Sequence, residues 1–152
     1  MSDVNFENHP IDQLTPQEIA ERCSAFLQAN DGCAETLDIS IDSVGPGTAE
    51  LSMKVSERYA NGYGFCQGGI ITTLADTAFA HASNSYNQVT VAQGLSVDFV
   101  RPAVIGDTLT AIASEQFRGR LTGVYEIKVV NSKKKLVAIM SGKSFSLEKN
   151  VI

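Results

Sequence analysis

Residues 61–69, Asn-Gly-Tyr-Gly-Phe-Cys-Gln-Gly-Gly, and residues 70–83, Ile-Ile-Thr-Thr-Leu-Ala-Asp-Thr-Ala-Phe-Ala-His-Ala-Ser, decide the fold of this chain. Apolar residues keep helical spacing from Gly68 to about Ser83, and almost every face of this helix is apolar. A helix of that kind is buried rather than laid on a surface. We therefore expect a long buried helix that starts at the glycines and carries one charge, Asp76.

Segments on both sides of this helix alternate apolar and polar residues, as half-buried strands do. Two of them, 35–43 and 49–55, precede the helix and are separated by the turn Gly45-Pro46-Gly47. Four more follow it, near 89–100, 107–118, 121–131 and 136–147. Many antiparallel strands with one buried helix predict an α+β fold, in which the sheet wraps around that helix.

The N-terminal part of the chain carries the signals of a helix start. Thr15 can cap the helix, Pro16 suits its first position, and Glu18 completes a capping box. Apolar residues then fall on one face: Ile19, Cys23, Phe26 and Leu27. We expect an amphipathic helix of about four turns that stops near Gly32.

Length and composition place the chain among folded, single-domain proteins. At 152 residues, with 43% hydrophobic and 19% charged residues, it predicts one domain, 1–152. This domain divides into an N-terminal segment and helix, 1–32, and a core, 33–148. No apolar run is long enough to span a membrane, and residues 1–5 lack the basic and apolar regions of a signal peptide. Three cysteines without paired spacing are expected as reduced, buried thiols of a cytoplasmic protein.

The net charge of −5 argues against general nucleic-acid binding, but the charges are unevenly distributed. Residues 1–60 carry 11 acidic and 3 basic side chains, whereas residues 101–152 carry 4 acidic and 9 basic ones. The nearly uncharged segment 61–100 between them is expected to be the buried centre of the fold. Lys133-Lys134-Lys135 is typical of a solvated hairpin turn. Arg118, Arg120 and Lys143 are candidates for binding the phosphates of a nucleotide-bearing ligand.

Two features of the central helix suggest chemistry. Burying the carboxylate of Asp76 without a partner is costly, so it is either held by hydrogen bonds or serves as a base or nucleophile in a cleft. Gly68 and Gly69 are either needed for close packing or expose backbone N–H groups at the helix start. Such groups suit a carbonyl oxygen that becomes negative, as in acyl transfer.

Helix geometry limits how these two features can cooperate. Gly68 and Asp76 are eight positions apart, or about 12 Å along the helix axis, so they cannot both touch one carbonyl carbon. If they serve one site, Asp76 must come from a second, antiparallel copy of the helix. The sequence thus favours a homodimer with two equivalent sites at its interface.

Other reactive residues are weaker candidates. His81 lies about 140° around the helix from Asp76, so we expect a hydrogen-bonded structural role for it. His9 lies in the N-terminal segment and is given no chemical role. Cys66 has no base near it in sequence and is expected to be a buried thiol. The His and Cys residues lack metal-ligand spacing, so no metal site is predicted.

The segments Asn61–Gly69 and Leu74–Ala80 resemble the signature of the hotdog-fold acyl-CoA thioesterases, in particular the PaaI, or phenylacetic-acid-degradation, branch. Further segments resemble the same family: Val97–Pro102, Gly106–Leu109, Thr122–Tyr125 and Gly142–Ser144. The likeness extends from about residue 61 to residue 146, and it is the combination that is specific.

The resemblance implies a hotdog fold, in dimers that pair into tetramers. It implies that Asp76 is the general base or nucleophile, supplied across the dimer interface. It also implies that the N–H of Gly68 polarises the thioester carbonyl and that Asn61 helps place water or the acyl group. Gly69 would lie beside them in the substrate site. The acyl group would be phenylacetyl or a ring-hydroxylated relative, with coenzyme A as part of the substrate and neither cofactor nor metal required.

Position 67 departs from the family, which usually has His-Gly-Gly where this chain has Gln67-Gly68-Gly69. The Gln67 amide can orient the loop or the thioester, but it cannot change protonation near neutral pH. The alternative function is therefore a non-catalytic acyl-CoA-binding hotdog protein, a sensor or carrier. A hydratase or dehydratase would need a histidine in the site, and no histidine lies near Gly68 in sequence.

Overall fold

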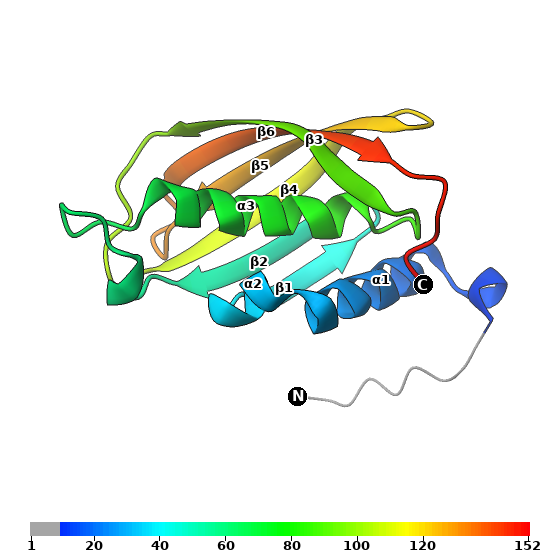
Figure 1. Ribbon diagram of the computed structural model, residues 1–152, viewed down its shortest axis with the longest axis horizontal. Coiled ribbons are helices and arrows are strands. Elements are labelled where there is room, and N and C mark those ends of the chain that lie inside the picture. The colour runs from blue at the N-terminus through cyan, green and yellow to red at the C-terminus, as the bar shows by residue number, and fades with distance from the viewer. Residues whose placement is uncertain (1–9) are drawn as a thin grey trace.

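The computed structural model describes residues 10–152, which form one curved sheet around a central helix (Figure 1). The helices are α1 (Pro16–Asn30), α2 (Gly32–Thr36) and α3 (Gly68–Ser83), with 3-10 turns η1 (Ile11–Gln13) and η2 (Glu57–Tyr59). The strands are β1 (Ser40–Gly45), β2 (Thr48–Lys54), β3 (Thr90–Phe99), β4 (Thr108–Arg118), β5 (Thr122–Val130) and β6 (Leu136–Ser146). Residues 1–5, used for the signal-peptide prediction, and His9 lie outside this range.

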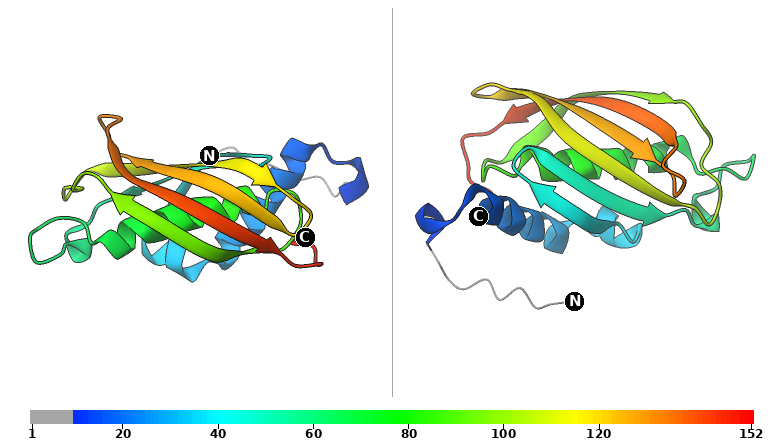
Figure 2. Two further views of the ribbon diagram at one scale, coloured as in Figure 1. Left: turned by 90° about the horizontal axis from the view of Figure 1, so that it is seen from above. Right: turned by 180° about the vertical axis from the view of Figure 1, so that it is seen from behind.

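The strands form a single antiparallel sheet in the order β1-β2-β4-β5-β6-β3. Figure 2 shows the sheet curving over α3, which lies along its concave face. This is the predicted α+β arrangement. Strands β1 and β3 are the two edges, so β3 pairs only with β6.

Helix α3 is held against the sheet by small residues on both sides of the contact. Three residues of α3 are fully buried, Leu74, Ala78 and Ala82, and β4, which contacts α3, buries Ala111 and Ala113. Alanines let the helix and the sheet approach closely, which explains how so apolar a helix fits beneath so curved a sheet. The prediction of a buried central helix is confirmed.

One aromatic pair fixes the middle of this packing. The rings of Phe79 and Tyr125 are 5.2 Å apart and tilted by 57°. A Cβ atom added at Gly142 would lie only 3.1 Å from the Phe79 ring, so glycine is required there for the ring to fit. Full burial of a phenylalanine side chain contributes about 1.5–3 kcal/mol to stability.

Helix α1 starts as predicted. The Thr15 hydroxyl accepts a hydrogen bond from the Glu18 N–H, and the Glu18 carboxylate accepts one from the Thr15 N–H at 2.8 Å. The helix packs on β1 and on the end of α3, burying Ala20, Cys23 and Ser24. The expectation that Phe26 faces the core is wrong, because its side chain is 47% exposed.

The predicted strand 35–43 is wrong at its start, because residues 32–36 form α2. The Asp31 carboxylate accepts hydrogen bonds from the N–H groups of Cys33 and Ala34, at 3.0 and 2.9 Å. Gly32 thus begins a second helix rather than merely ending the first. The second helix ends with Asp38 in the left-handed region (φ 52°) and an Ile39 N–H bond to the Ala34 carbonyl. Cys33 is exposed, so the expectation of three buried thiols fails for it.

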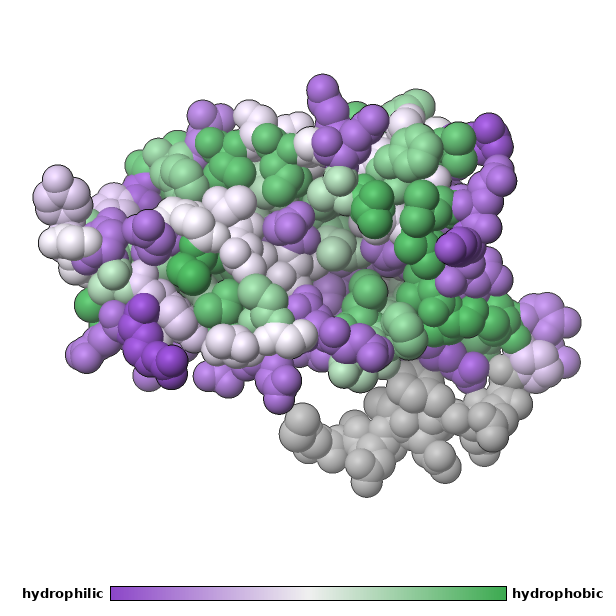
Figure 3. All heavy atoms as spheres, viewed as in Figure 1, coloured by the Kyte–Doolittle hydropathy of each residue, from purple (hydrophilic) through white to green (hydrophobic). Residues whose placement is uncertain are grey.

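The edge strand β3 is the least covered part of the sheet, although segment 61–100 was expected to be the buried centre. Its side chains Leu95 and Phe99 are 40% and 51% exposed. Both lie on the face of the sheet that holds α3, since Leu95 pairs with Gly142 and Phe99 with Ala138. Figure 3 shows apolar residues along this edge next to the paler, small residues of α3.

Helix α3 leaves one stripe uncovered beside this edge. We call it the open stripe: Gly69, Thr72, Thr73, Asp76 and Ala80. The hydroxyls of Thr72 and Thr73 donate to the carbonyls of Gly68 and Gly69, each at 2.9 Å. The stripe therefore has its hydroxyls satisfied within the helix itself. No helix among residues 10–152 is long and apolar enough to cross a membrane.

Candidate functional site

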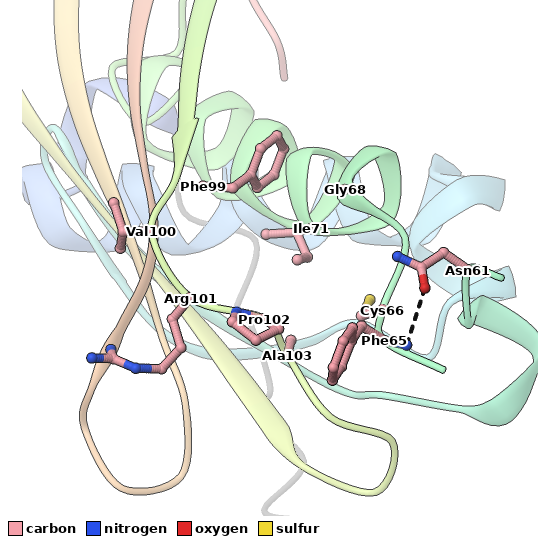
Figure 4. Close-up of a pocket in the computed structure, with 10 residues that line it drawn as sticks. All are labelled: Asn61, Phe65, Cys66, Gly68, Ile71, Phe99, Val100, Arg101, Pro102 and Ala103. Carbon is pink, nitrogen blue, oxygen red and sulfur yellow. Dashed lines mark hydrogen bonds between the residues drawn. The ribbon is translucent and has the colours of Figure 1, made fainter. Parts of the chain in front are cut away.

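A cavity of about 340 Å³ opens at the N-terminal end of α3 (Figure 4). One wall comes from the glycine-rich loop and the first turns of α3, and the other from the end of β3 and the segment after it. The lining residues are Asn61, Phe65, Cys66, Gly68, Ile71, Phe99, Val100, Arg101, Pro102 and Ala103. The cavity is largely apolar, with a few polar groups from the loop, as small-molecule sites usually are.

Asn61 shapes the loop that forms the cavity wall. Its side-chain oxygen Oδ1 accepts hydrogen bonds from the N–H groups of Tyr63 (2.9 Å) and Phe65 (3.2 Å). Its backbone N–H donates to the Phe65 carbonyl at 2.7 Å, and Gly64 takes φ +79° to close the turn. The Nδ2 group has no partner among residues 10–152, and Figure 4 shows it turned toward the start of α3. Asn61 thus offers the two N–H donors of its side-chain amide to the cavity.

The start of α3 supplies further donors. The N–H groups of Gly68 and Gly69 meet no acceptor within the described chain, and no side chain caps them. Helix N-termini leave such groups free and carry a partial positive charge. A Cβ atom on Gly68 would lie 3.1 Å from Cζ of Phe99, whereas one on Gly69 would meet nothing within 4 Å. Gly68 therefore lies under the Phe99 ring, and Gly69 faces open space.

Gln67 contributes its backbone to this arrangement. Its carbonyl accepts hydrogen bonds from the N–H groups of Ile70 and Ile71, and its own N–H donates to the Tyr59 carbonyl. Its side chain is exposed, makes no capping hydrogen bond and does not line the cavity. Within one subunit, the Gln67 amide therefore lies outside the cavity in which it was expected to orient the thioester.

Asp76 lies two turns further along α3, on the open stripe and outside the cavity. The pKa of its carboxyl group is raised, mainly because partial burial disfavours the charged form, and further because the charge of Asp31 lies nearby. No hydrogen bond lowers it again. The sequence left open whether hydrogen bonds hold the Asp76 carboxylate. Among residues 10–152 no such hydrogen bond is found, so this alternative is wrong there.

The other reactive residues have structural positions. Burial raises the pKa of the Cys66 thiol to about 11, so the thiol stays protonated and is a poor nucleophile. The Ser24 hydroxyl and Nδ1 of His81 are 2.6 Å apart, which confirms the predicted hydrogen-bonded role of His81. Burial lowers the pKa of His81 to about 4. Among residues 10–152, no three His, Cys, Asp or Glu side chains gather as metal ligands.

The three basic residues expected to bind phosphates have different neighbours in the subunit. Arg118 lies over the Tyr86 ring, 3.9 Å from its centroid, near the C-terminal end of α3. Arg120 pairs with Glu148 at 3.3 Å in the β4–β5 connection. Lys143 lines a separate hollow with Gly94, Leu95 and Ser141. All three lie apart from the cavity at the start of α3.

Comparisons with known proteins agree with this architecture. Residues 63–138 match the model of the thioesterase superfamily. The acyl-coenzyme A thioesterase PaaI of Escherichia coli K12 is 47% identical over 118 residues, covering 78% of this chain and 84% of the relative. The chain belongs to the PaaI family of hotdog-fold acyl-CoA thioesterases.

Solved structures place the fold in the same family. The structure of E. coli PaaI, from the phenylacetic acid degradation operon, superposes with a TM-score of 0.88 at 40% identity, covering 90% of this chain and 99% of PaaI. The Streptococcus mutans protein smu.793, solved with acetyl-CoA bound, gives a TM-score of 0.71 at 28% identity, covering 74% and 90%. The hotdog fold of this thioesterase is thereby confirmed.

Sequence reasoning missed one wall of the cavity. Residues 99–103 were predicted only as the end of a strand and part of the family signature, yet they supply half of the cavity lining. The available signal was the pair Phe99-Val100, two large apolar residues at the point where the strand ends before Pro102. Asp31, whose charge raises the pKa of Asp76, was missed as well and had no sequence signal.

Proposed function

We propose that two copies of this thioesterase build each active site together, with Gly68 of one copy holding the thioester carbonyl and the partner's Asp76 attacking it. The observation that carries the proposal is the layout of α3. Among residues 10–152, the N–H groups at its start have no acceptor, and the Asp76 carboxylate, with a raised pKa and no hydrogen-bond partner, lies two turns later on the open stripe. These groups are about 12 Å apart along the helix axis, so one carbonyl carbon cannot contact both of them within a single subunit.

The surface around α3 supports pairing with a second copy. The open stripe is small and has its hydroxyls satisfied, and the adjoining edge strand β3 exposes Leu95 and Phe99. An edge strand with apolar side chains and unpaired backbone groups is a template for a further strand. An antiparallel second copy would continue the sheet past β3 and lay its own α3 against the first. Such dimers would pair into tetramers, as the family resemblance implies.

The chemistry follows from these groups. In the base route, the partner's Asp76 removes a proton from water while the water oxygen bonds to the thioester carbon. The carbonyl oxygen takes the displaced electron pair, stabilised by the Gly68 N–H, which is worth several kcal/mol when donors are preorganised. The C–S bond then breaks, and the coenzyme A sulfur leaves with its electron pair and receives the proton. A raised pKa makes Asp76 the stronger base.

In the nucleophile route, an Asp76 oxygen bonds directly to the thioester carbon as the C–S bond breaks, and the coenzyme A sulfur leaves with the bonding electron pair and is protonated by solvent. The resulting mixed anhydride is hydrolysed by water, which releases the free acid and restores Asp76. Both routes use the same two residues, with Asn61 Nδ2 available to orient water or the acyl group. Neither route requires a metal ion or a prosthetic group.

For the acyl group we propose phenylacetyl or a ring-hydroxylated phenylacetyl. The cavity walls include the rings of Phe65 and Phe99 together with Ile71 and Pro102, an apolar and partly aromatic surface. Aromatic rings pack well on such a surface in stacked or edge-to-face arrangements. The similarity to the E. coli PaaI protein supports the same choice.

The test is release of coenzyme A thiol from phenylacetyl-CoA, its ring-hydroxylated relatives and aliphatic acyl-CoAs. Asp76→Asn should lower kcat by about 10²–10⁴-fold, because the variant keeps the shape of the side chain and loses the base or nucleophile. Asp42→Asn is the matched control, since Asp42 lies exposed on β1 and only accepts a hydrogen bond from Ser52. Full activity in Asp76→Asn would contradict the mechanism. Binding without turnover would favour the non-catalytic acyl-CoA-binding alternative.

A further inference from the structure

A second hollow, of about 510 Å³, adjoins the cavity at the start of α3. Arg101 and Pro102 line both hollows, so they form one continuous depression across the segment after β3. We call the second hollow the basic groove, after its charged lining residues Arg101, Lys133 and Lys135; Asp107 also lines it. Three cations against one carboxylate give the groove a net charge of +2 on a chain whose net charge is −5.

The cations of the basic groove are available for a ligand. Within residues 10–152, Arg101, Lys133 and Lys135 take part in no ion pair; the pairs of Arg120 with Glu148 and of Lys128 with Glu126 do not involve the groove. Arg101 donates one N–H to the Leu136 carbonyl, and a guanidinium has five N–H donors. Figure 4 shows the Arg101 side chain directed away from Gly68 and toward the β5–β6 hairpin.

The turn that carries the lysines is fixed by its own hydrogen bonds. The Asn131 side-chain oxygen accepts from the N–H groups of Lys133 and Lys135, both at 3.0 Å. Oδ1 of Asp107 accepts from the Ser132 N–H (3.3 Å) and the Thr108 N–H (2.9 Å). Asp107 thus ties the turn to the segment that borders the cavity, and its carboxylate is partly used by backbone donors. The predicted hairpin turn is confirmed, but it also forms one wall of a groove.

We propose that the basic groove binds the phosphates of the coenzyme A nucleotide while the thioester lies in the cavity beside Gly68. The inference rests on the proposed function, because it takes acyl-CoA as the ligand. Coenzyme A carries a pyrophosphate and a 3′-phosphate at the end remote from the thioester. Arginine and lysine are the side chains that bind such groups, through charge-assisted hydrogen bonds. This assignment replaces Arg118, Arg120 and Lys143, which lie elsewhere in the subunit.

The decisive variant is Lys133→Ala/Lys135→Ala, which removes two cations from an exposed turn and leaves its backbone hydrogen bonds in place. The matched control is Lys134→Asn. Lys134 lies in the same turn but does not line the groove, and asparagine tolerates its positive φ of 59°. The double variant and the control are compared with wild type for hydrolysis of phenylacetyl-CoA and of S-phenylacetyl-pantetheine. The second substrate carries the same thioester without the nucleotide.

We expect KM for phenylacetyl-CoA to rise about tenfold in the double variant, equivalent to about 1.4 kcal/mol. Its kcat, and KM for the pantetheine thioester, should stay within about twofold of wild type, because the thioester cavity is untouched. The increase in KM should shrink at high salt, which screens the phosphate contacts. If KM for phenylacetyl-CoA rose in Lys143→Ala or Arg120→Ala but not in the double variant, the assignment would be overturned.

Direct binding separates this inference from the proposed function. Titration calorimetry with coenzyme A and with dephospho-coenzyme A requires no turnover. If the wild type hydrolyses no thioester, the proposed function fails, yet a coenzyme A Kd about tenfold weaker in the double variant than in Lys134→Asn still supports the groove. Equal Kd values in these two variants, or no coenzyme A binding by the wild type, would refute it.

Discussion

The ring of Phe99 lies against Gly68, so close that a Cβ atom at position 68 would be 3.1 Å from Cζ of the ring. The contact joins the end of β3 to the first residue of α3. It holds one wall of the cavity at a fixed distance from the free N–H groups of the helix. Gly68 is thus needed for close packing, and its N–H group also has no acceptor among residues 10–152, so both features that the sequence left as alternatives are present.

Gly68→Ala should therefore lower kcat without unfolding the protein. The added methyl group displaces the half-exposed Phe99 ring or the start of the helix, and oxyanion donors lose effect when they move. Since loss of one such donor costs about 10²–10³-fold in kcat, we expect a decrease of about 10–100-fold for its displacement. Steady-state kinetics on the best acyl-CoA substrate measure this effect.

A second substitution tests the cause of that loss. Phe99→Leu shortens the side chain opposite Gly68, so the double variant Gly68→Ala/Phe99→Leu should recover part of the lost kcat. If the double variant were as slow as Gly68→Ala, the ring contact would not be the reason for the loss. Thermal melts of the variants, compared with wild type, check that each remains folded.

Asp76 is predicted to weaken the fold that carries it. Its pKa is higher in the folded protein than the ordinary value of 3.8, so the folded state disfavours the ionised form. The ionised carboxylate destabilises the folded state to the full extent above the raised pKa, and this destabilisation decreases as the pH falls toward 3.8. Asp76→Asn should therefore raise the free energy of unfolding at pH 7, because the neutral amide has no buried charge to destabilise the fold.

Urea denaturation of wild type and Asp76→Asn across pH 4–7 measures that difference. The gap between the two proteins should be widest at pH 7 and should close as the pH falls. Asp42→Asn, which changes the same group on exposed β1, provides the reference for loss of a surface charge. A variant less stable than wild type at pH 7 would mean that Asp76 is held by favourable contacts after all.

The sequence predicted the elements whose signals are local. The capping box of Thr15 and Glu18, and the apolar character of α3, each require only neighbouring residues. The strand boundaries of β3 to β6 were also close, because glycines, Pro102 and Asn131 interrupt the alternation at the ends of the strands. Asn61 and Gly68, which the family resemblance implies as site residues, line one cavity.

Features that depend on tertiary contacts were missed. Leu37 and Ile39 are buried as an alternating strand requires, yet Asp31 caps a short helix just before them. The exposure of β3 could not be predicted because its apolar alternation is the same whether α3 or a second copy covers it. Arg118, Arg120 and Lys143 share the basic third of the sequence, but the hairpins that carry them place them away from the cavity, whereas the lysine turn lies beside it.

We expect protonation of His81 to lower the stability of the protein in mild acid. Burial lowers its pKa from 6.5 to about 4, and its Nε2 is buried without a partner among residues 10–152. The stability that the neutral ring provides is fully present above pH 6.5 and is lost as the pH falls toward 4, in total on the order of 3 kcal/mol. Denaturation at pH 7 and pH 5 should show this decline for the wild type.

Two variants assign that decline to the imidazole. His81→Gln removes the titrating ring and should flatten the pH dependence over the same range, whatever its stability at pH 7. Ser24→Ala deletes the hydrogen-bond partner of Nδ1, which lies 2.6 Å away, but keeps the ring, so the decline should persist. An unchanged slope in His81→Gln would show that other groups cause the loss.

Mixing two variants of reduced activity tests whether each site is shared. If Gly68 and the partner's Asp76 form one site, a mixed dimer of Gly68→Ala and Asp76→Asn subunits contains one intact site and one doubly altered site. Random pairing makes half of the dimers mixed, so an equimolar mixture that is denatured and refolded together should regain about a quarter of the wild-type activity. The unmixed variants, refolded in the same way, should stay far below that level. If each subunit carried a complete site, the mixture would be no more active than the average of its components, because no dimer would then contain an intact Gly68 and an intact Asp76 in the same site.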